Sequence, residues 1–344
     1  MLHITNGESV VGTFRKVRFP GTYLSWLDVL HDGPVPQTQT LEELSDVRAQ
    51  ALAGFGWGSP EKLRAEFAAR DRALADFRRH EEIVLWFEHD QFDQLQLLQL
   101  LDWFAQQELG SLKLSLVQVD SYPGVKPFYG LGQLSGAQLV RLFPARVPVT
   151  AAHTAPAREA WQAFRSTDPG ALLSQAQRPS SALPFLAAAL RRFLQEYPWT
   201  GDGLSRTERQ VLLAAARGRR RKEDLYIEAS KQEETPWGDS SVYLRMAGLA
   251  AGPYPALAKA EARQDGKAGQ NENVSHHGSA GQDEKAAHDE YEITDSGRQL
   301  LAGQADWITL RGGVDRWLGG VHLTGPQPQW RWDEGRGTLI KSAI

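Results

Sequence analysis

The most apolar segment of the chain runs directly into an acidic cluster. Residues 83–87 (Ile-Val-Leu-Trp-Phe) have the uniformly apolar profile of a strand that is buried on both faces of a parallel sheet. Glu88 and Asp90 follow at once, and a helical pattern begins at Asp93. Because parallel strands are joined by crossover connections that usually contain a helix, this segment favours a sheet covered by helices on both faces.

The same alternation of strand and helix extends over the first 150 residues. Further strands are predicted at residues 2–5, 23–28 and 112–119. Two helical patterns, residues 41–55 and 60–80, are polar enough to lie at the surface. We therefore expect residues 1–150 to form an α/β ligand-binding domain, built on a mostly parallel sheet with flanking helices.

Residues 203–303 have the pattern of a different domain. A capping box at Ser205 and Glu208 opens the first of three helical patterns, and two extended segments and a last helix follow. This order is typical of a winged helix-turn-helix, so we expect a winged-helix-like domain. Residues 259–290 interrupt it with a polar stretch that is poor in large apolar side chains, and they are predicted to be a disordered insertion.

The remaining segments are expected to join and cover these domains. Residues 151–202 are mainly helical in pattern and are predicted to be a helical connector. Residues 304–344 hold four tryptophans, and exposing all of them would create an apolar patch that soluble proteins avoid. We therefore expect this Trp-rich tail to dock on the body of the protein, with Trp317 substantially buried.

Composition excludes several classes of protein. The chain has 38 Lys and Arg against 42 Asp and Glu, a formal charge of −4, so it is not a uniformly basic nucleic-acid coat. It has no cysteine, so any metal would need His, Asp or Glu ligands. No apolar run approaches the roughly 20 residues of a membrane span, and the start lacks a signal-peptide pattern. We expect a cytoplasmic protein without a membrane partner.

Polar residues follow each predicted strand of the α/β domain. The carboxyl ends of parallel strands meet at one edge of a sheet, where ligands bind in such folds. At the first strand end, Asn6 and Gly7 would form a tight turn and Ser9 could cap the next helix, whose N–H groups suit a phosphate or carboxylate. His31 and Gln94 are expected to contact a ligand at the same edge. Turn and cap residues of this kind are also common without a ligand.

Four carboxylates complete the candidate site. Asp28, Glu88, Asp90 and Asp93 could hold Mg²⁺ or Mn²⁺ or act as acid and base, so they are the candidate catalytic residues. Taken singly, Asp90 or Asp93 is better explained as a helix N-cap, and His31 and His89 are better explained as solvated loop residues. Only their clustering favours function, and no named catalytic motif is present to specify a reaction.

The residue content of the winged-helix-like domain does not favour DNA binding. Its third helical pattern, residues 240–251, carries Arg245 as its only basic residue. A basic run at residues 217–222 could contact a phosphate backbone, but the insertion at residues 259–290 has four basic against seven acidic side chains. We therefore prefer a packing or protein-contact role, and DNA stays the less favoured partner.

Three segments of the α/β domain have distinctive sequences. They are residues 3–9 (His-Ile-Thr-Asn-Gly-Glu-Ser), 26–35 (Trp-Leu-Asp-Val-Leu-His-Asp-Gly-Pro-Val) and 85–95 (Leu-Trp-Phe-Glu-His-Asp-Gln-Phe-Asp-Gln-Leu). They resemble the bacterial domain-of-unknown-function family 1835, and residues 315–320 (Asp-Arg-Trp-Leu-Gly-Gly) are similar to relatives of this length. The family has no established activity, so the resemblance implies no catalytic role.

These observations lead to one functional hypothesis and one alternative. We expect the α/β domain to bind an anionic, phosphorylated small molecule or nucleotide at the carboxyl edge of its sheet, with a divalent metal as a candidate cofactor. The alternative is a ligand-responsive regulator whose winged helix contacts DNA or a partner protein.

Overall fold

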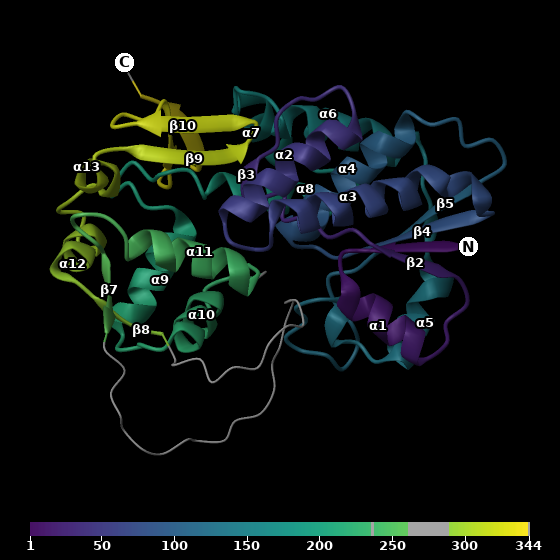
Figure 1. The fold of residues 1–344 in the computed structure, drawn as a ribbon, viewed down its shortest axis with the longest axis horizontal. Coiled ribbons are helices and arrows are strands. Elements are labelled where there is room, and N and C mark those ends of the chain that lie inside the picture. Colours follow the sequence, from purple (N-terminus) through teal and green to yellow (C-terminus); the bar gives the residue numbers. More distant parts are fainter. Residues whose placement is uncertain (235–236, 261–288, 343–344) are drawn as a thin grey trace. The chain divides into compact units, whose positions relative to one another are not determined.

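The computed structural model describes residues 1–234, 237–260 and 289–342. The chain divides into two compact units (Figure 1). Unit 1 comprises Met1–Phe193 with Arg316–His322, and unit 2 comprises Leu194–Asp315 with Leu323–Ile344. The segment expected to be a connector, residues 151–202, is therefore shared between the two units.

Unit 1 is built on a five-stranded sheet of order β2-β1-β4-β5-β6. Four of its strands are parallel, and the last is antiparallel to its neighbour. The strands are β1 (Leu2–Thr5), β2 (Thr22–Ser25), β4 (Glu82–Phe87), β5 (Lys113–Gln118) and β6 (Val147–Pro148). The prediction of an α/β fold with a mostly parallel sheet is thereby confirmed.

Helices cover both faces of this sheet (Figure 1). Val84 and Trp86 of β4 share one core with Val10 and Phe14 of α1, and Phe14 meets the Trp86 ring edge-on at 5.1 Å between centroids. Because side chains alternate along a strand, the other side chains of β4 face α4. The helices up to residue 194 are α1 (Glu8–Lys16), α2 (Leu41–Gly54), α3 (Pro60–Ala75), α4 (Gln91–Ala105), α5 (Gly136–Leu142), α6 (Ala151–Phe164), α7 (Gly170–Ala176) and α8 (Leu186–Leu194), and α6 packs on α4.

Unit 2 contains three helices, a two-stranded hairpin and two short helices. Its first helix opens with the predicted capping box, in which Ser205 Oγ accepts from Glu208 N and Glu208 Oε2 accepts from Ser205 N. The elements are α9 (Arg206–Ala216), α10 (Lys222–Ser230), α11 (Asp239–Leu249), β7 (Leu257–Ala260), β8 (Glu290–Ile293), α12 (Asp295–Leu301) and α13 (Trp307–Arg311). They share one apolar core that includes Val211, Met246 and Trp307.

The antiparallel pairing of β7 with β8 shows that the predicted disordered insertion is too long at both ends. Ala260 lies opposite Glu290 in this hairpin, so the first and last residues of the segment 259–290 are ordered strand residues. They pair because Leu257 and Ile293 at the other end of the hairpin are buried in the core. The rest of the predicted disordered insertion, residues 261–288, lies outside the described residues.

The C-terminal segment forms four strands. They are β9 (Val314–Gly319), β10 (Val321–Gly325), β11 (Trp330–Asp333) and β12 (Thr338–Lys341), and β9 is parallel to the short β3 (Gly33–Pro34) of unit 1. Trp307 and Trp332 are fully buried. Trp317, expected to be the buried anchor, is only half-buried and stacks on His322, whereas its neighbour Leu318 is fully buried.

Among the described residues, none of the helices combines the length and the apolar content that a membrane crossing requires.

Close backbone approach at Gly320 predicts a large effect of a small substitution. A Cβ atom there would lie 2.1 Å from the Arg165 carbonyl oxygen, so we expect Gly320→Ala to lower the free energy of unfolding by about 1–3 kcal/mol. Gly54, at the end of α2, faces open space, and Gly54→Ala should be neutral or slightly stabilising. Urea unfolding of both variants checks this, and equal midpoints would contradict the packing described here.

Candidate functional site

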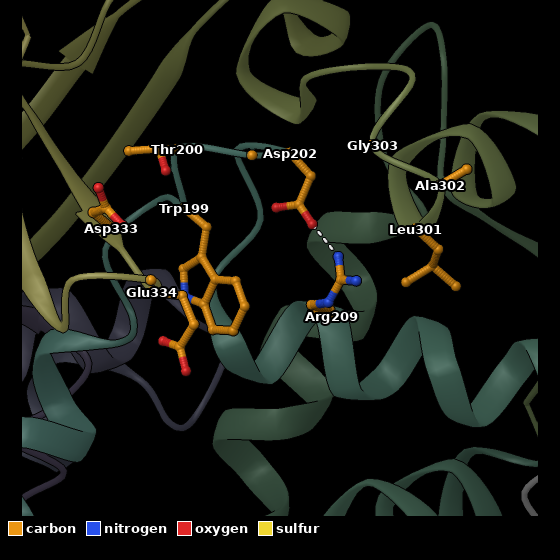
Figure 2. Close-up of a pocket in the computed structure, with 11 residues that line it drawn as sticks. Trp199, Thr200, Asp202, Arg209, Leu301, Ala302, Gly303, Asp333 and Glu334 are labelled. Carbon is orange, nitrogen blue, oxygen red and sulfur yellow. Dashed lines mark hydrogen bonds and ion pairs between the residues drawn. The ribbon is translucent and has the colours of Figure 1, made fainter.

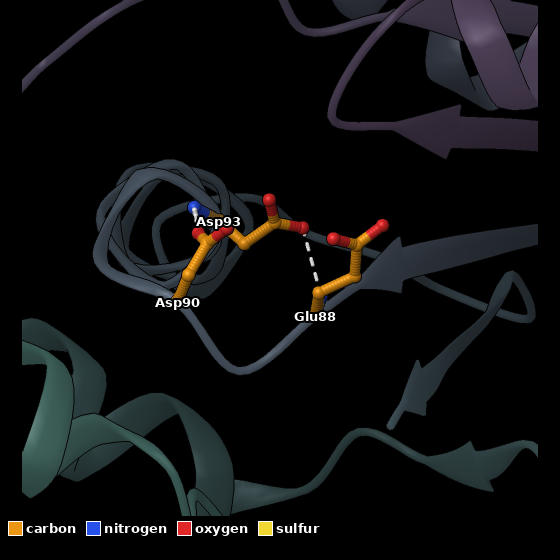
Figure 3. A group of neighbouring side chains, drawn as sticks. All are labelled: Glu88, Asp90 and Asp93. Carbon is orange, nitrogen blue, oxygen red and sulfur yellow. Dashed lines mark hydrogen bonds between the residues drawn. The ribbon is translucent and has the colours of Figure 1, made fainter. Parts of the chain in front are cut away.

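The turn between β4 and α4 places three carboxyl groups together. Asp90 is the N-cap of α4, and its Oδ1 accepts from the Asp93 backbone N–H at 2.8 Å. Oxygen atoms of Glu88, Asp90 and Asp93 lie within 4.8 Å of one another (Figure 3). We call these three residues the acidic triad. Asp90 is therefore both a helix cap and a member of a carboxylate cluster, and the two interpretations of this residue do not exclude each other.

Asp93 is held by two hydrogen bonds from opposite sides. Its Oδ1 accepts from the Glu88 backbone N–H at 2.7 Å, and its Oδ2 accepts from Asn6 Nδ2 at 2.9 Å. Asn6 follows β1, whereas Glu88 follows β4, so this carboxylate joins two neighbouring strand ends. Gln94 steadies the same turn by donating from Nε2 to the Glu88 carbonyl oxygen at 2.5 Å. The structure thus brings Asn6, Gln94 and the acidic triad together, as the sequence predicts.

Glu88 is the least satisfied member of the acidic triad. Its side chain is buried, and its Oε1 accepts from the Leu131 backbone N–H. Its Oε2 is buried without a hydrogen-bond partner among the described residues. The backbone of Gly130 closes over this oxygen, since a Cβ atom at Gly130 would lie 2.0 Å from Oε2. A buried carboxylate oxygen without a partner is costly unless it carries a proton or binds a cation.

The acidic triad is short of positive charge. Burial, and then the Asp90 carboxylate, raise the pKa of Glu88 well above its ordinary value. Burial, and then Glu88 and Asp90, do the same to the pKa of Asp93, and burial raises the pKa of Asp90 to about 6. In the part of the chain that the structure describes, none of the three forms an ion pair with a Lys, Arg or His side chain. Three acidic oxygens in this arrangement are suited to a divalent cation.

Asp28 does not belong to the acidic triad. Its Oδ1 accepts from Arg48 Nε at 2.9 Å, and both side chains are fully buried. The other nitrogens of Arg48 donate to the carbonyl oxygens of Val29, Asp32 and Pro34. The ion pair therefore holds the loop after β2. The prediction that Asp28 shares metal or acid–base chemistry with the other carboxylates is not supported by this geometry, because a cation already neutralises it.

Arg48 is the residue that the sequence analysis missed. It lies in α2, whose polar pattern predicts a surface helix, yet its guanidinium is completely buried. The two acidic residues of the turn at residues 28–34, Asp28 and Asp32, are the only signal in the sequence for such a partner. His31, in that turn, contacts the ring of Phe92 and so reaches the start of α4. Its Nε2 lies 3.7 Å from Oδ2 of Asp32.

The turn after β1 differs from the prediction in its cap. Gly7, and not Ser9, is the N-cap of α1, and it offers no side chain to the helix. Ser9 lies within the first turn of α1 and is exposed, because the helix begins two residues earlier than a cap at Ser9 allows. Thr5 Oγ1 donates to the Gly7 carbonyl oxygen at 2.9 Å and so fixes the turn.

Comparison with protein-family models, curated proteins and solved structures finds no match to this chain. The resemblance to family 1835 therefore stays a prediction.

The raised pKa values of the acidic triad predict how stability depends on pH. A carboxyl whose pKa is higher in the folded protein stabilises the fold at low pH, and this contribution is lost as pH rises through the folded value. Without added metal, the free energy of unfolding should fall from about pH 4 to beyond pH 6, the pKa of Asp90. Glu88→Gln should reduce this fall and be more stable than the wild type at pH 8 by about 1 kcal/mol or more.

Urea unfolding between pH 4 and pH 8 measures this effect. Glu81→Gln is the matched control, since Glu81 is exposed and immediately precedes β4. The interpretation fails if Glu88→Gln and Glu81→Gln follow the same pH profile as the wild type.

Proposed function

We propose that unit 1 binds Mg²⁺ or Mn²⁺ through Glu88, Asp90 and Asp93, and that the metal holds an anionic, phosphorylated small molecule or nucleotide. The observation that supports this proposal is the buried Oε2 of Glu88, which has no hydrogen-bond partner among the described residues and lies within a cluster of three carboxyl groups. Carboxylate oxygens and ligand phosphates are the groups with which proteins hold Mg²⁺.

The turn at Gly7 supports the phosphate part of the proposal. Gly7 lies directly before α1, where the free N–H groups of the first turn and the helix dipole favour an anion. The hydrogen bond from Asn6 to Asp93 keeps this turn beside the acidic triad. Glu8 is the one acidic residue in the first turn of α1, and its carboxylate is paired with Arg15 at 3.2 Å.

We propose, as the alternative, that α9 to α12 and the β7–β8 hairpin form a winged-helix-like module of a ligand-responsive regulator that contacts a protein. The ion pairs of its basic residues support a protein partner over DNA. Arg245 in α11 is buried and lies 3.6 Å from Glu196. Arg217 and Arg219 pair with Glu228, and Arg220 pairs with Glu290 and Glu292. Phosphate contacts would have to compete with these carboxylates.

Metal binding predicts stabilisation that depends on the acidic triad. Mn²⁺ or Mg²⁺ at about 100 times its dissociation constant should stabilise the wild type by about 2.7 kcal/mol. The effect should be larger at pH 8 than at pH 5, because protons compete for carboxyls whose pKa values are raised. Glu88→Gln and Asp93→Asn should abolish it, and Glu81→Gln should keep it.

Thermal unfolding with and without each metal tests the prediction, and Mn²⁺ electron paramagnetic resonance counts the bound ions. ADP and ribose 5-phosphate should raise the melting temperature further only when metal is present. An equal metal effect in the wild type and in both triad variants would contradict the assigned ligands.

The paired basic residues predict weak DNA binding. At about 0.15 M salt, the full chain should bind a random 30-base-pair duplex no more tightly than ordinary non-specific binding, on the order of 10⁻⁴ to 10⁻⁶ M. Fluorescence anisotropy over a salt series measures this. A nanomolar affinity that falls steeply with salt would favour the DNA-binding regulator.

A further inference from the structure

Unit 2 contains a cavity of about 390 Å³ that is separate from the acidic triad. Three stretches of chain line it (Figure 2). They are the segment before α9 together with Arg209 of α9 itself, the end of α12 at Leu301, and the turn between β11 and β12. All of these belong to unit 2, so the cavity is complete within one compact unit.

An indole ring forms one wall of this cavity. Figure 2 shows Trp199 at the centre of the labelled residues, between Arg209 and Glu334. Its Nε1 donates to the Gln195 carbonyl oxygen at 3.1 Å, and its backbone N–H donates to the Leu204 carbonyl oxygen at 2.8 Å. The ring is therefore held in place and is only partly buried. A fixed aromatic face beside open volume can receive a cation or a planar group.

The charges on the cavity wall favour a cation. The positive charge of Arg209 is already neutralised, because its guanidinium pairs with the buried carboxylate of Asp202. Asp333 and Glu334 add two further carboxylates, and the cavity lining contains no second basic side chain. The lining thus carries three acidic groups against one basic group.

Neither of these two carboxylates is strongly neutralised elsewhere. Asp333 pairs with Arg336 at 3.6 Å, but the Arg336 side chain is 74% exposed, and such surface pairs contribute little. Glu334 Oε2 accepts from Trp332 Nε1 at 2.6 Å, which is a neutral donor. Two acidic side chains without a strong basic partner line the cavity, and they disfavour a phosphate there.

We propose that this cavity binds an organic cation, with a guanidinium or alkylammonium group against Trp199 and facing the carboxylates of Asp333 and Glu334. The proposal is independent of the metal site in unit 1. The ring already has one such neighbour, since Arg209 Cζ lies 5.9 Å from its centroid. The ligand is either a basic side chain of a peptide or a free polyamine, because both present the same chemistry.

Isothermal titration calorimetry on the full chain separates charge from shape. N-acetyl-arginine amide should bind at least tenfold more tightly than N-acetyl-citrulline amide, which has nearly the same shape without the charge. Spermidine tests the polyamine source, and an arginine-containing tetrapeptide tests the peptide source; the tighter binder identifies the source. Equal affinities for the arginine and citrulline probes, or no heat from any cation at millimolar concentration, would overturn the proposal.

A double variant tests the assigned carboxylates. Asp333→Asn with Glu334→Gln should weaken binding of the preferred cation at least tenfold, because Gln can still accept from Trp332 Nε1 while the charge is lost. Glu223→Gln is the matched control, since Glu223 is exposed on α10 in the same unit. Urea unfolding should confirm that each variant folds. Unchanged affinity in the folded double variant would show that these carboxylates do not bind the cation.

Discussion

The parallel register of β1 between β2 and β4 determines where the polar side chains of unit 1 meet. Thr5 pairs with Trp86 and with Ser25, so the next residues of all three strands leave the sheet at the same edge. Asn6 is therefore one residue from the sheet when it donates to Asp93. A shift of β1 by one residue would turn its buried side chains to the opposite face and separate these partners.

Three carboxylates elsewhere in the described residues each have an arginine partner. Asp28 has Arg48, Glu82 has Arg146 and Asp202 has Arg209. The hydrogen bond from Arg146 lowers the pKa of Glu82, whereas the pKa values of the acidic triad are raised. Among the described residues, the acidic triad has no such basic partner, and this charge balance suits a site that takes its cation from solution. This contrast is the physical basis of the proposed metal site.

Local pattern predicts the sheet and most of the candidate site, because both depend on where apolar strands end. Glu88, Asp90 and Asp93 follow one strand, and the parallel arrangement alone brings Asn6 to them. The sequence alone does not show that Asp28 lies apart from these carboxylates, because its partner Arg48 comes from a helix whose polar pattern is typical of a solvated helix. The cavity of unit 2 could not be predicted from the sequence either, because Trp199 and Glu334 are far apart in the sequence and come together only through tertiary packing.

Proton release on metal binding tests the central claim most directly. If the acidic triad holds protons until a divalent ion replaces them, calorimetric titration with Mn²⁺ at pH 7, in two buffers of different ionisation enthalpy, should show one ion bound per chain and at least one proton released. No Mn²⁺ binding, or binding without a buffer-dependent heat, would contradict the account.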